Sequence, residues 1–195
     1  MTPPTSALRS STRVSLGEFS SEFSEAWTQI KSRFVKLECW QRYQELGANE
    51  SQEAYNHGDI ARAQVLLKTE AEADRSLYED IGRQGIDYVR IRLVQHPLTS
   101  YMQYELLAYK IRAQMGESIE VVECDPNVKL PNDDYFDFLL FDRHTALIHD
   151  YGSGEVGLQS GGWVTHDSDV IAMLESKIVP LRQVAMPLDK FVSGK

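Results

Sequence analysis

The sequence predicts an α/β protein in which N-terminal helices precede a small mixed sheet. Three patterns in the 195 residues indicate this class. Apolar and aromatic residues recur at steps of three and four over residues 16–37, which is the period of an amphipathic helix. A strand, a helix and a second strand follow one another over residues 88–123, as in a βαβ unit. Two apolar runs around a polar turn at 142–144 predict a β-hairpin.

The N-terminal part of the chain is predicted to be an arm followed by a helix. Residues 1–14 contain two prolines and a Ser/Thr cluster without hydrophobic periodicity, so we expect a flexible arm. The helix is expected to begin at Ser15, because Ser15 and Glu18 have the spacing of a capping box. Its apolar stripe continues to Leu37 and is rich in aromatic residues, which is typical of a face packed against a core.

The next segment is polar and then helical again. Residues 41–58 contain glycines and asparagines, which predicts a loop with one short helix. Asp59 is a suitable N-cap for a second helix that extends to about Gly82. We therefore expect a helical N-terminal segment over residues 15–84 and an α/β domain over residues 85–195, the two forming one unit.

Residues 88–94 alternate strictly between two faces, as in a β-strand. One face carries Val89, Ile91 and Leu93, and the other carries Tyr88, Arg90 and Arg92. A helix follows from Thr99, a suitable N-cap, to Gly116, a suitable left-handed stop. With a second strand at 118–123, this pattern predicts a βαβ unit with parallel strands.

The C-terminal elements follow from shorter patterns. The run 138–141 is continuously apolar, so this strand of the hairpin is expected to be covered on both faces. A glycine-rich connection over 152–162 leads to a short last strand at 163–165. The final helix contains Pro180 within its periodicity, and we expect this proline to kink the helix or restart it.

Composition limits the class of protein. Twenty basic and 29 acidic side chains give a net charge of −9, which argues against general binding to nucleic acid. No stretch approaches the roughly 18 apolar residues that a membrane span needs. The first residues lack the hydrophobic block of a secretory signal, and the two cysteines are too few for a disulfide framework. We therefore expect a reduced, cytoplasmic protein without a membrane partner.

Motifs for metals, phosphates and nucleophiles are weak. Histidines and acids gather between residues 142 and 167, but His144 and His149 differ by an odd number of positions and fall on opposite strand faces. The glycines near 152–157 lie between two strands, whereas a dinucleotide fingerprint lies between a strand and a helix. Ser153 lacks the strand-to-helix context of a nucleophile elbow. We therefore expect no metal, no cofactor and no catalytic residue of these kinds.

The strongest candidate site is a polar face near the predicted βαβ unit. Two arginines on one strand face need either carboxylates or an anionic ligand. The carboxyl ends of parallel strands are the usual ligand crevice of an open α/β sheet. The candidate ligand-binding residues are Arg90, Arg92, Tyr101, Tyr104, Glu105, Asp137, Asp142 and His144. An internal salt-bridge network, with Asp137 and Asp142 answering the arginines, is the favoured interpretation, and a ligand pocket is the alternative.

Four segments carry a resemblance to a known family, and the resemblance covers most of residues 16–191. They are FVKLECWQRY at 34–43, YVRIRLVQHPLTSYMQYE at 88–105, GESI at 116–119 and DFLLFD at 137–142. The sequence resembles an uncharacterised actinobacterial domain family whose members are often encoded beside helix-turn-helix regulators. The family implies no activity, but it implies a regulator as a protein partner. Ser118 and Leu139 depart from its pattern, which has an acidic and an aromatic residue at these places.

The C-terminal half is distantly similar to phospholipase-D-like ligand-sensing domains of bacterial regulators. The likeness lies in the Asp142 turn, in TALI at 145–148 and in the end of the last helix at 184–188. Catalytic members need a His-x-Lys-x-x-x-x-Asp motif. His144, His149 and His166 all lack a lysine two positions later. The resemblance therefore implies a phospholipase-D-like core without hydrolase chemistry.

Together these observations predict a non-catalytic regulatory or interaction protein that binds a protein partner or a small anionic ligand. The alternative is a small-molecule enzyme accessory to specialised metabolism, using the face formed by Arg90, Arg92, Tyr101, Glu105 and Asp142. The deciding observation is the environment of the two arginines. An open pocket beside them would favour ligand binding and the enzyme hypothesis, whereas a closed set of carboxylates would favour an internal salt-bridge network.

Overall fold

The computed structural model describes residues 3–44, 49–152, 154 and 156–194; Ser153, discussed above, lies outside them. The helices are α1 (Thr5–Leu8), α2 (Leu16–Gln29), α3 (Glu50–Asn56), α4 (Ile60–Ala73), α5 (Arg75–Gln84), α6 (Ser100–Gln114), α7 (Ser168–Val184) and α8 (Leu188–Ser193). The strands are β1 (Thr12–Ser15), β2 (Arg33–Glu38), β3 (Asp87–Val94), β4 (Ile119–Glu123), β5 (Phe138–Phe141), β6 (Thr145–Asp150), β7 (Gly161–Thr165) and β8 (Met186–Pro187).

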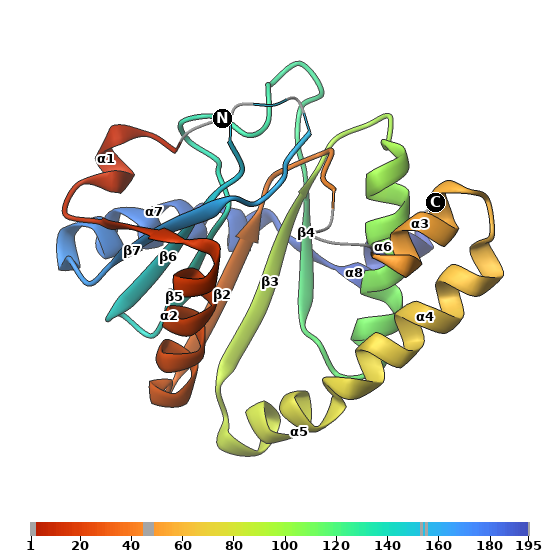
Figure 1. The fold of residues 1–195 in the computed structure, drawn as a ribbon, viewed down its shortest axis with the longest axis horizontal. Helices are drawn as coiled ribbons and strands as arrows, with labels where there is room; N and C mark the ends of the chain where they lie inside the picture. The colour runs from red at the N-terminus through yellow and green to blue at the C-terminus, as the bar shows by residue number, and fades with distance from the viewer. Residues whose placement is uncertain (1–2, 45–48, 153, 155, 195) are drawn as a thin grey trace.

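One mixed sheet organises the fold, with eight strands in the order β1-β7-β6-β5-β2-β3-β4-β8 (Figure 1). Strands β2, β3 and β4 run parallel, and β5, β6, β7 and β1 continue the sheet with antiparallel pairing. The βαβ unit is confirmed as β3-α6-β4, and the hairpin is confirmed as β5-β6. The protein therefore has the predicted α/β class, on a larger sheet than the sequence patterns indicated.

Strand β2 corrects the prediction that one helix extends to Leu37. Helix α2 has the expected capping box, but Ile30 leaves it with an extended backbone (ψ 138°). The three-residue step between Phe34 and Leu37 fits a helix, but Val35 and Leu37 also alternate with polar residues, and both are fully buried in the core. Strand alternation wins because β2 is paired on both sides, with β3 and with β5. The segment 15–84 thus supplies a central strand and is not helical throughout.

The predicted arm over 1–14 forms regular structure in the part that is described. Ala7 of α1 is fully buried in the main core, and β1 pairs along β7 from Thr12 to Ser15. Backbone pairing to a distant strand orders this segment, and composition does not reveal it. The predicted second helix is divided in two, because Asp74 caps both the end of α4 and the start of α5.

Helices cover both faces of the sheet. In Figure 1, α2 and α6 lie in front of the sheet and α7 lies behind it. Helix α7 buries Val170, Leu174 and Ile178 against the central strands, and it continues through Pro180 without the predicted restart. Pro180 is exposed, so the carbonyl that loses its helical partner faces solvent. None of the described helices is long and apolar enough to cross a membrane.

Candidate functional site

Four polar residues form one row across the centre of the sheet. Arg92 on β3 pairs in register with Glu38 on β2. Next to Glu38 is Asp137, whose carboxylate accepts the Cys39 N–H at 2.6 Å. The backbone N–H of His149, on β6, donates to the backbone carbonyl of Asp137 at 3.1 Å. Because side chains alternate along strands, these four point to one face, opposite the core that α7 covers.

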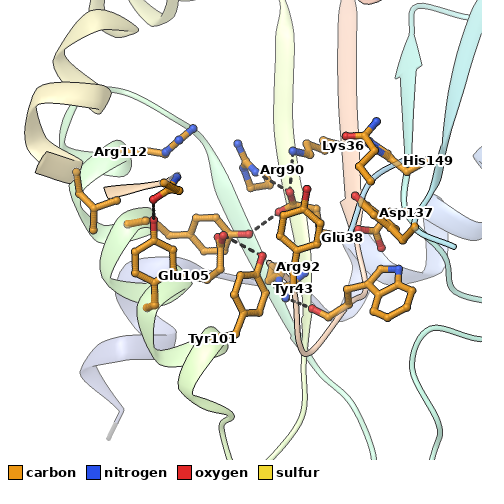
Figure 2. A pocket seen from close by; sticks show the side chains of 18 of the residues that line it. Lys36, Glu38, Tyr43, Arg90, Arg92, Tyr101, Glu105, Arg112, Asp137 and His149 are labelled. Carbon is orange, nitrogen blue, oxygen red and sulfur yellow. Dashed lines mark hydrogen bonds and ion pairs between the residues drawn. The ribbon is translucent and has the colours of Figure 1, made fainter. Parts of the chain in front are cut away.

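A cavity of about 240 Å³ lies over this row, and residues of α6 and α4 contribute to its wall. Figure 2 shows Tyr101 and Glu105 of α6 on one side of the Glu38–Arg90 pair, and Asp137 and His149 on the other. The row lies where β2 and β3 end, which is the carboxyl edge of the parallel strands. The cavity therefore lies at the edge where open α/β sheets usually bind ligands.

Arg90 belongs to a closed ion-pair network. Its guanidinium contacts Glu38 at 2.8 Å and Glu117 at 2.7 Å, and Lys36 contacts Glu38 at 2.7 Å. Burial alone would raise the pKa values of Glu38 and Glu117, but the neighbouring cations hold both below the usual value. The predicted salt-bridge network thus exists around Arg90, but Glu38 and Glu117 supply its acids in place of Asp137 and Asp142.

Arg92 has a different environment. It is 1% exposed, and no carboxylate among the described residues lies within 4 Å of it. Its Nη2 donates to the Trp40 carbonyl and lies 2.7 Å from the Met102 sulfur, whereas its Nε has no partner. The Tyr101 ring lies 5.8 Å from the guanidinium carbon. Arg92 is therefore a buried cation that lines a cavity without a described carboxylate in direct contact, although Glu38 and Glu105 are near enough to help raise the pKa of its guanidinium against the effect of burial.

Glu105 on α6 is the complementary case. It is 9% exposed and lines the same cavity, and no cation in the described part of the chain lies within 4 Å of its carboxylate. The Tyr101 hydroxyl donates to it at 2.9 Å. Burial raises the pKa of Tyr101 well above its usual value, so this hydroxyl keeps its proton and remains a donor.

Asp137 and His149 are two buried acid–base groups in the cavity wall. Burial raises the pKa of Asp137 to about 6. Burial, together with Lys36, lowers the pKa of His149 to about 3, although Glu38 and the Gln159 side chain oppose this shift. The His149 imidazole is therefore neutral near pH 7. Among the described residues, neither ring nitrogen has a hydrogen bond of ordinary geometry.

Asp137 and His149 should give opposite pH dependences of stability. The folded protein favours protonated Asp137, because its pKa is higher in the folded state than in the unfolded chain. This stabilisation of the folded state is fully present below the ordinary pKa of 3.8 and is lost as the pH rises through about 6. The contribution of His149 is present above its ordinary pKa of 6.5 and is lost as the pH falls through about 3. Between pH 4 and 6 we therefore expect the two to cancel.

Variants should separate these contributions. Relative to wild type, we expect Asp137→Asn to lose about 2 kcal/mol of stability from pH 6 to pH 4, and His149→Gln to lose a similar amount from pH 4 to pH 6. Urea unfolding at pH 4, 5 and 6 measures both slopes. Asp134→Asn is the control, because this acid has an 86% exposed side chain. Slopes of the same sign in the two variants would contradict the assignment.

The structure places six of the eight predicted site residues in the cavity wall. They are Arg90, Arg92, Tyr101, Tyr104, Glu105 and Asp137. Asp142 and His144 lie outside it, because β5 carries the chain from Asp137 to the other end of the sheet. There the Asp142 carboxylate accepts backbone N–H groups of Lys31, Ser32 and Arg33, which holds the hairpin turn to the start of β2.

Sequence reasoning missed several residues of the cavity wall and of the Arg90 ion-pair network. Glu38 and Lys36 were hidden because their strand was predicted as helix. Glu117, which pairs with Arg90, follows Gly116 in the connection between α6 and β4. It belongs to no periodic run, so the sequence did not indicate that it is buried. His149 was considered only as a metal ligand or a surface histidine. Its odd separation from His144 already puts the two side chains on opposite faces of the strand, and this signal could have placed His149 on the polar face of the sheet.

Comparisons with known proteins agree with the sequence resemblance in its coarse form. No curated protein matches the chain. A family described as a domain of unknown function, DUF6879, matches residues 21–193. This span contains β2 to β8 and every residue of the row from Arg92 to His149. The chain therefore belongs to the DUF6879 family.

Proposed function

We propose that this protein is a non-catalytic regulatory protein that binds a small organic anion, a carboxylate, in the cavity over Arg92. The observation that carries the proposal is the environment of Arg92. Burying a charged side chain without a counter-ion lowers the stability of the folded protein, so a buried charge is normally paired with an opposite one. A guanidinium binds a carboxylate with two parallel hydrogen bonds, so a bound carboxylate would supply the partner that Arg92 lacks.

The size of the cavity restricts the ligand. Pockets for drug-sized molecules measure roughly 300–1,000 Å³, and this cavity of about 240 Å³ is smaller. Its wall is also strongly polar, with tyrosines such as Tyr101, Tyr104 and Tyr109 among the charged groups. These properties favour a small hydrophilic metabolite over an apolar acid.

The regulatory part of the proposal rests on sequence. The resemblance to actinobacterial domains encoded beside helix-turn-helix regulators supports a regulator as the protein partner, in the cytoplasm. The distant likeness to phospholipase-D-like ligand-sensing domains supports ligand sensing without hydrolysis. Pull-down from the native host, with and without ligand, tests the partner.

A small-molecule enzyme is the second candidate function. Asp137 and a neutral His149 lie in one cavity, and perturbed acid–base groups gather at catalytic sites. Turnover of a small carboxylate that is lost in both His149→Gln and Asp137→Asn would favour this candidate over the sensor.

The binding proposal predicts a strong effect at Arg92. We expect small carboxylates to raise the melting temperature of the wild-type protein, and Arg92→Gln to weaken their binding about 30-fold or more. Isothermal titration calorimetry measures the affinity. Arg33→Gln is the matched control, because Arg33 lies on neighbouring β2 but pairs with Glu175 at 2.6 Å, outside the cavity. Equal affinity of Arg92→Gln and wild type would overturn the proposal.

A further inference from the structure

We infer that the ligand is a small zwitterion whose carboxylate binds Arg92 and whose ammonium group binds Glu105, an inference that rests on the proposed binding of a carboxylate in this cavity. Arg92 and Glu105 carry opposite charges and are 1% and 9% exposed. Both line the cavity, and neither has an ion-pair partner within 4 Å in the part of the chain that the structure describes. Each is therefore a buried charge at the cavity without an ion pair in direct contact among the described residues, although Glu38 and Glu105 act on Arg92 over a longer distance and help to hold the pKa of its guanidinium above the ordinary value against the effect of burial.

Tyr101 separates the two charges and relates them spatially. Its ring lies 5.8 Å from the Arg92 guanidinium, and its hydroxyl donates to Glu105 at 2.9 Å. Tyr101 and Glu105 are one helical turn apart on α6, so both face the sheet from the same side. Tyr101 thus neighbours both anchors, with its ring next to the Arg92 guanidinium and its hydroxyl on the Glu105 carboxylate. Two opposite charges that share one tyrosine neighbour are close enough for a small amino acid to reach both.

The charge balance of the wall favours a zwitterion over a simple anion. Besides Arg92 and Glu105, the described wall residues include the cations Lys36, Arg90 and Arg112 and the acids Glu38, Glu70 and Asp137. The numbers of cations and acids are equal. A simple anion would add net negative charge to a site of low dielectric and would leave Glu105 without a counter-ion. A zwitterion compensates both anchors and leaves the net charge unchanged.

Aromatic rings border the ammonium end. Tyr43 and Tyr101 both line the cavity, with their ring centroids 5.8 Å apart. An ammonium group near a tyrosine face gains cation–π attraction, which is stronger when water is excluded. Glu105 therefore lies beside an aromatic side chain, Tyr101, whose ring is in turn packed against Tyr43, and a carboxylate next to aromatic rings is a favourable environment for an ammonium group.

Matched probes test the inference in the wild-type protein. Two series are titrated by calorimetry at pH 7: alanine, propionate and ethylamine, and 4-aminobutyrate, butyrate and butylamine. In at least one series we expect the zwitterion to bind at least 10-fold more tightly than both of its partners. Equal affinity of the zwitterion and the carboxylate in each series would overturn the inference but leave carboxylate binding intact. Failure of every carboxylate and zwitterion to bind would overturn both proposals.

A variant locates the ammonium group. We expect Glu105→Gln to reduce the affinity for the zwitterion to that of the matching carboxylate, without weakening the carboxylate. Glu175→Gln is the control, because this acid pairs with Arg33 and does not line the cavity. Glu105→Asp, which retains the charge on a shorter side chain, should keep part of the preference. A preference that is unchanged in Glu105→Gln would overturn the assignment.

Discussion

Replacing Glu117 with methionine should lower the free energy of unfolding by about 3–5 kcal/mol, since it removes one partner of a buried ion pair. The Glu117 side chain is fully buried, and its carboxylate accepts from Arg90 at 2.7 Å and from Tyr88 at 3.0 Å. Without it, Glu38 is the one ion-pair partner of Arg90 among the described residues, and Glu38 also neutralises Lys36. Guanidinium-chloride unfolding at pH 7 measures the loss.

Two further variants make this result interpretable. The double variant Arg90→Met with Glu117→Met removes both charges, so we expect it to recover most of the lost stability. Glu72→Met removes an ion pair with the same 2.7 Å distance, to Arg75, on the surface of the protein. Exposed pairs contribute little because solvent screens them, so we expect the stability of this variant to stay close to that of the wild type. Equal losses for Glu117→Met and Glu72→Met would contradict a buried network.

Gly162→Ala should be the most damaging conservative substitution in the sheet. A Cβ at Gly162 would lie 2.4 Å from the Ile148 carbonyl oxygen and 2.5 Å from the Phe19 ring. The oxygen belongs to the backbone of β6, and Phe19 is a buried residue of α2, so neither has room to move. We expect a loss of about 3 kcal/mol or more, or failure to fold.

Gly82→Ala is the matched control for this prediction. A Cβ at Gly82 in helix α5 meets no atom within 4 Å. Alanine also restricts the unfolded chain, so we expect a gain of about 0.5–1 kcal/mol. Thermal unfolding followed by circular dichroism compares the two. A Gly162→Ala variant that melts at or above the wild-type temperature would show that α2 does not pack on β7 as described.

The elements that sequence predicts best are those with one unambiguous period. Residues 89–93 alternate between apolar residues and arginines, and the run 138–141 is apolar throughout, so β3 and β5 were predictable. The run from Phe34 to Leu37 fits both a helical and a strand period. Its true state depends on pairing with residues 87–92 and 138–141, and a local window does not contain these partners.

The same reason divides the site into predictable and unpredictable parts. Arg90 and Arg92 were found because two arginines on one strand face need an explanation. Glu38 was missed because its strand was predicted as helix. Asp142 lies apart from the other predicted residues, because β5 carries the chain from Asp137 to the other end of the sheet. The decisive contrast, that Arg90 is paired and Arg92 is not, depends on long-range register.

The row of Arg92, Glu38, Asp137 and His149 also has a consequence for synthesis of the protein. Its members come from positions spread over more than half of the chain, and β7, which supports α2, follows them. A nascent chain therefore cannot form the complete cavity until residues up to Gln159, which also lines it, have left the ribosome. Such long-range pairing also slows folding. A ligand that binds only the completed cavity would stabilise finished molecules by mass action and leave truncated ones unprotected.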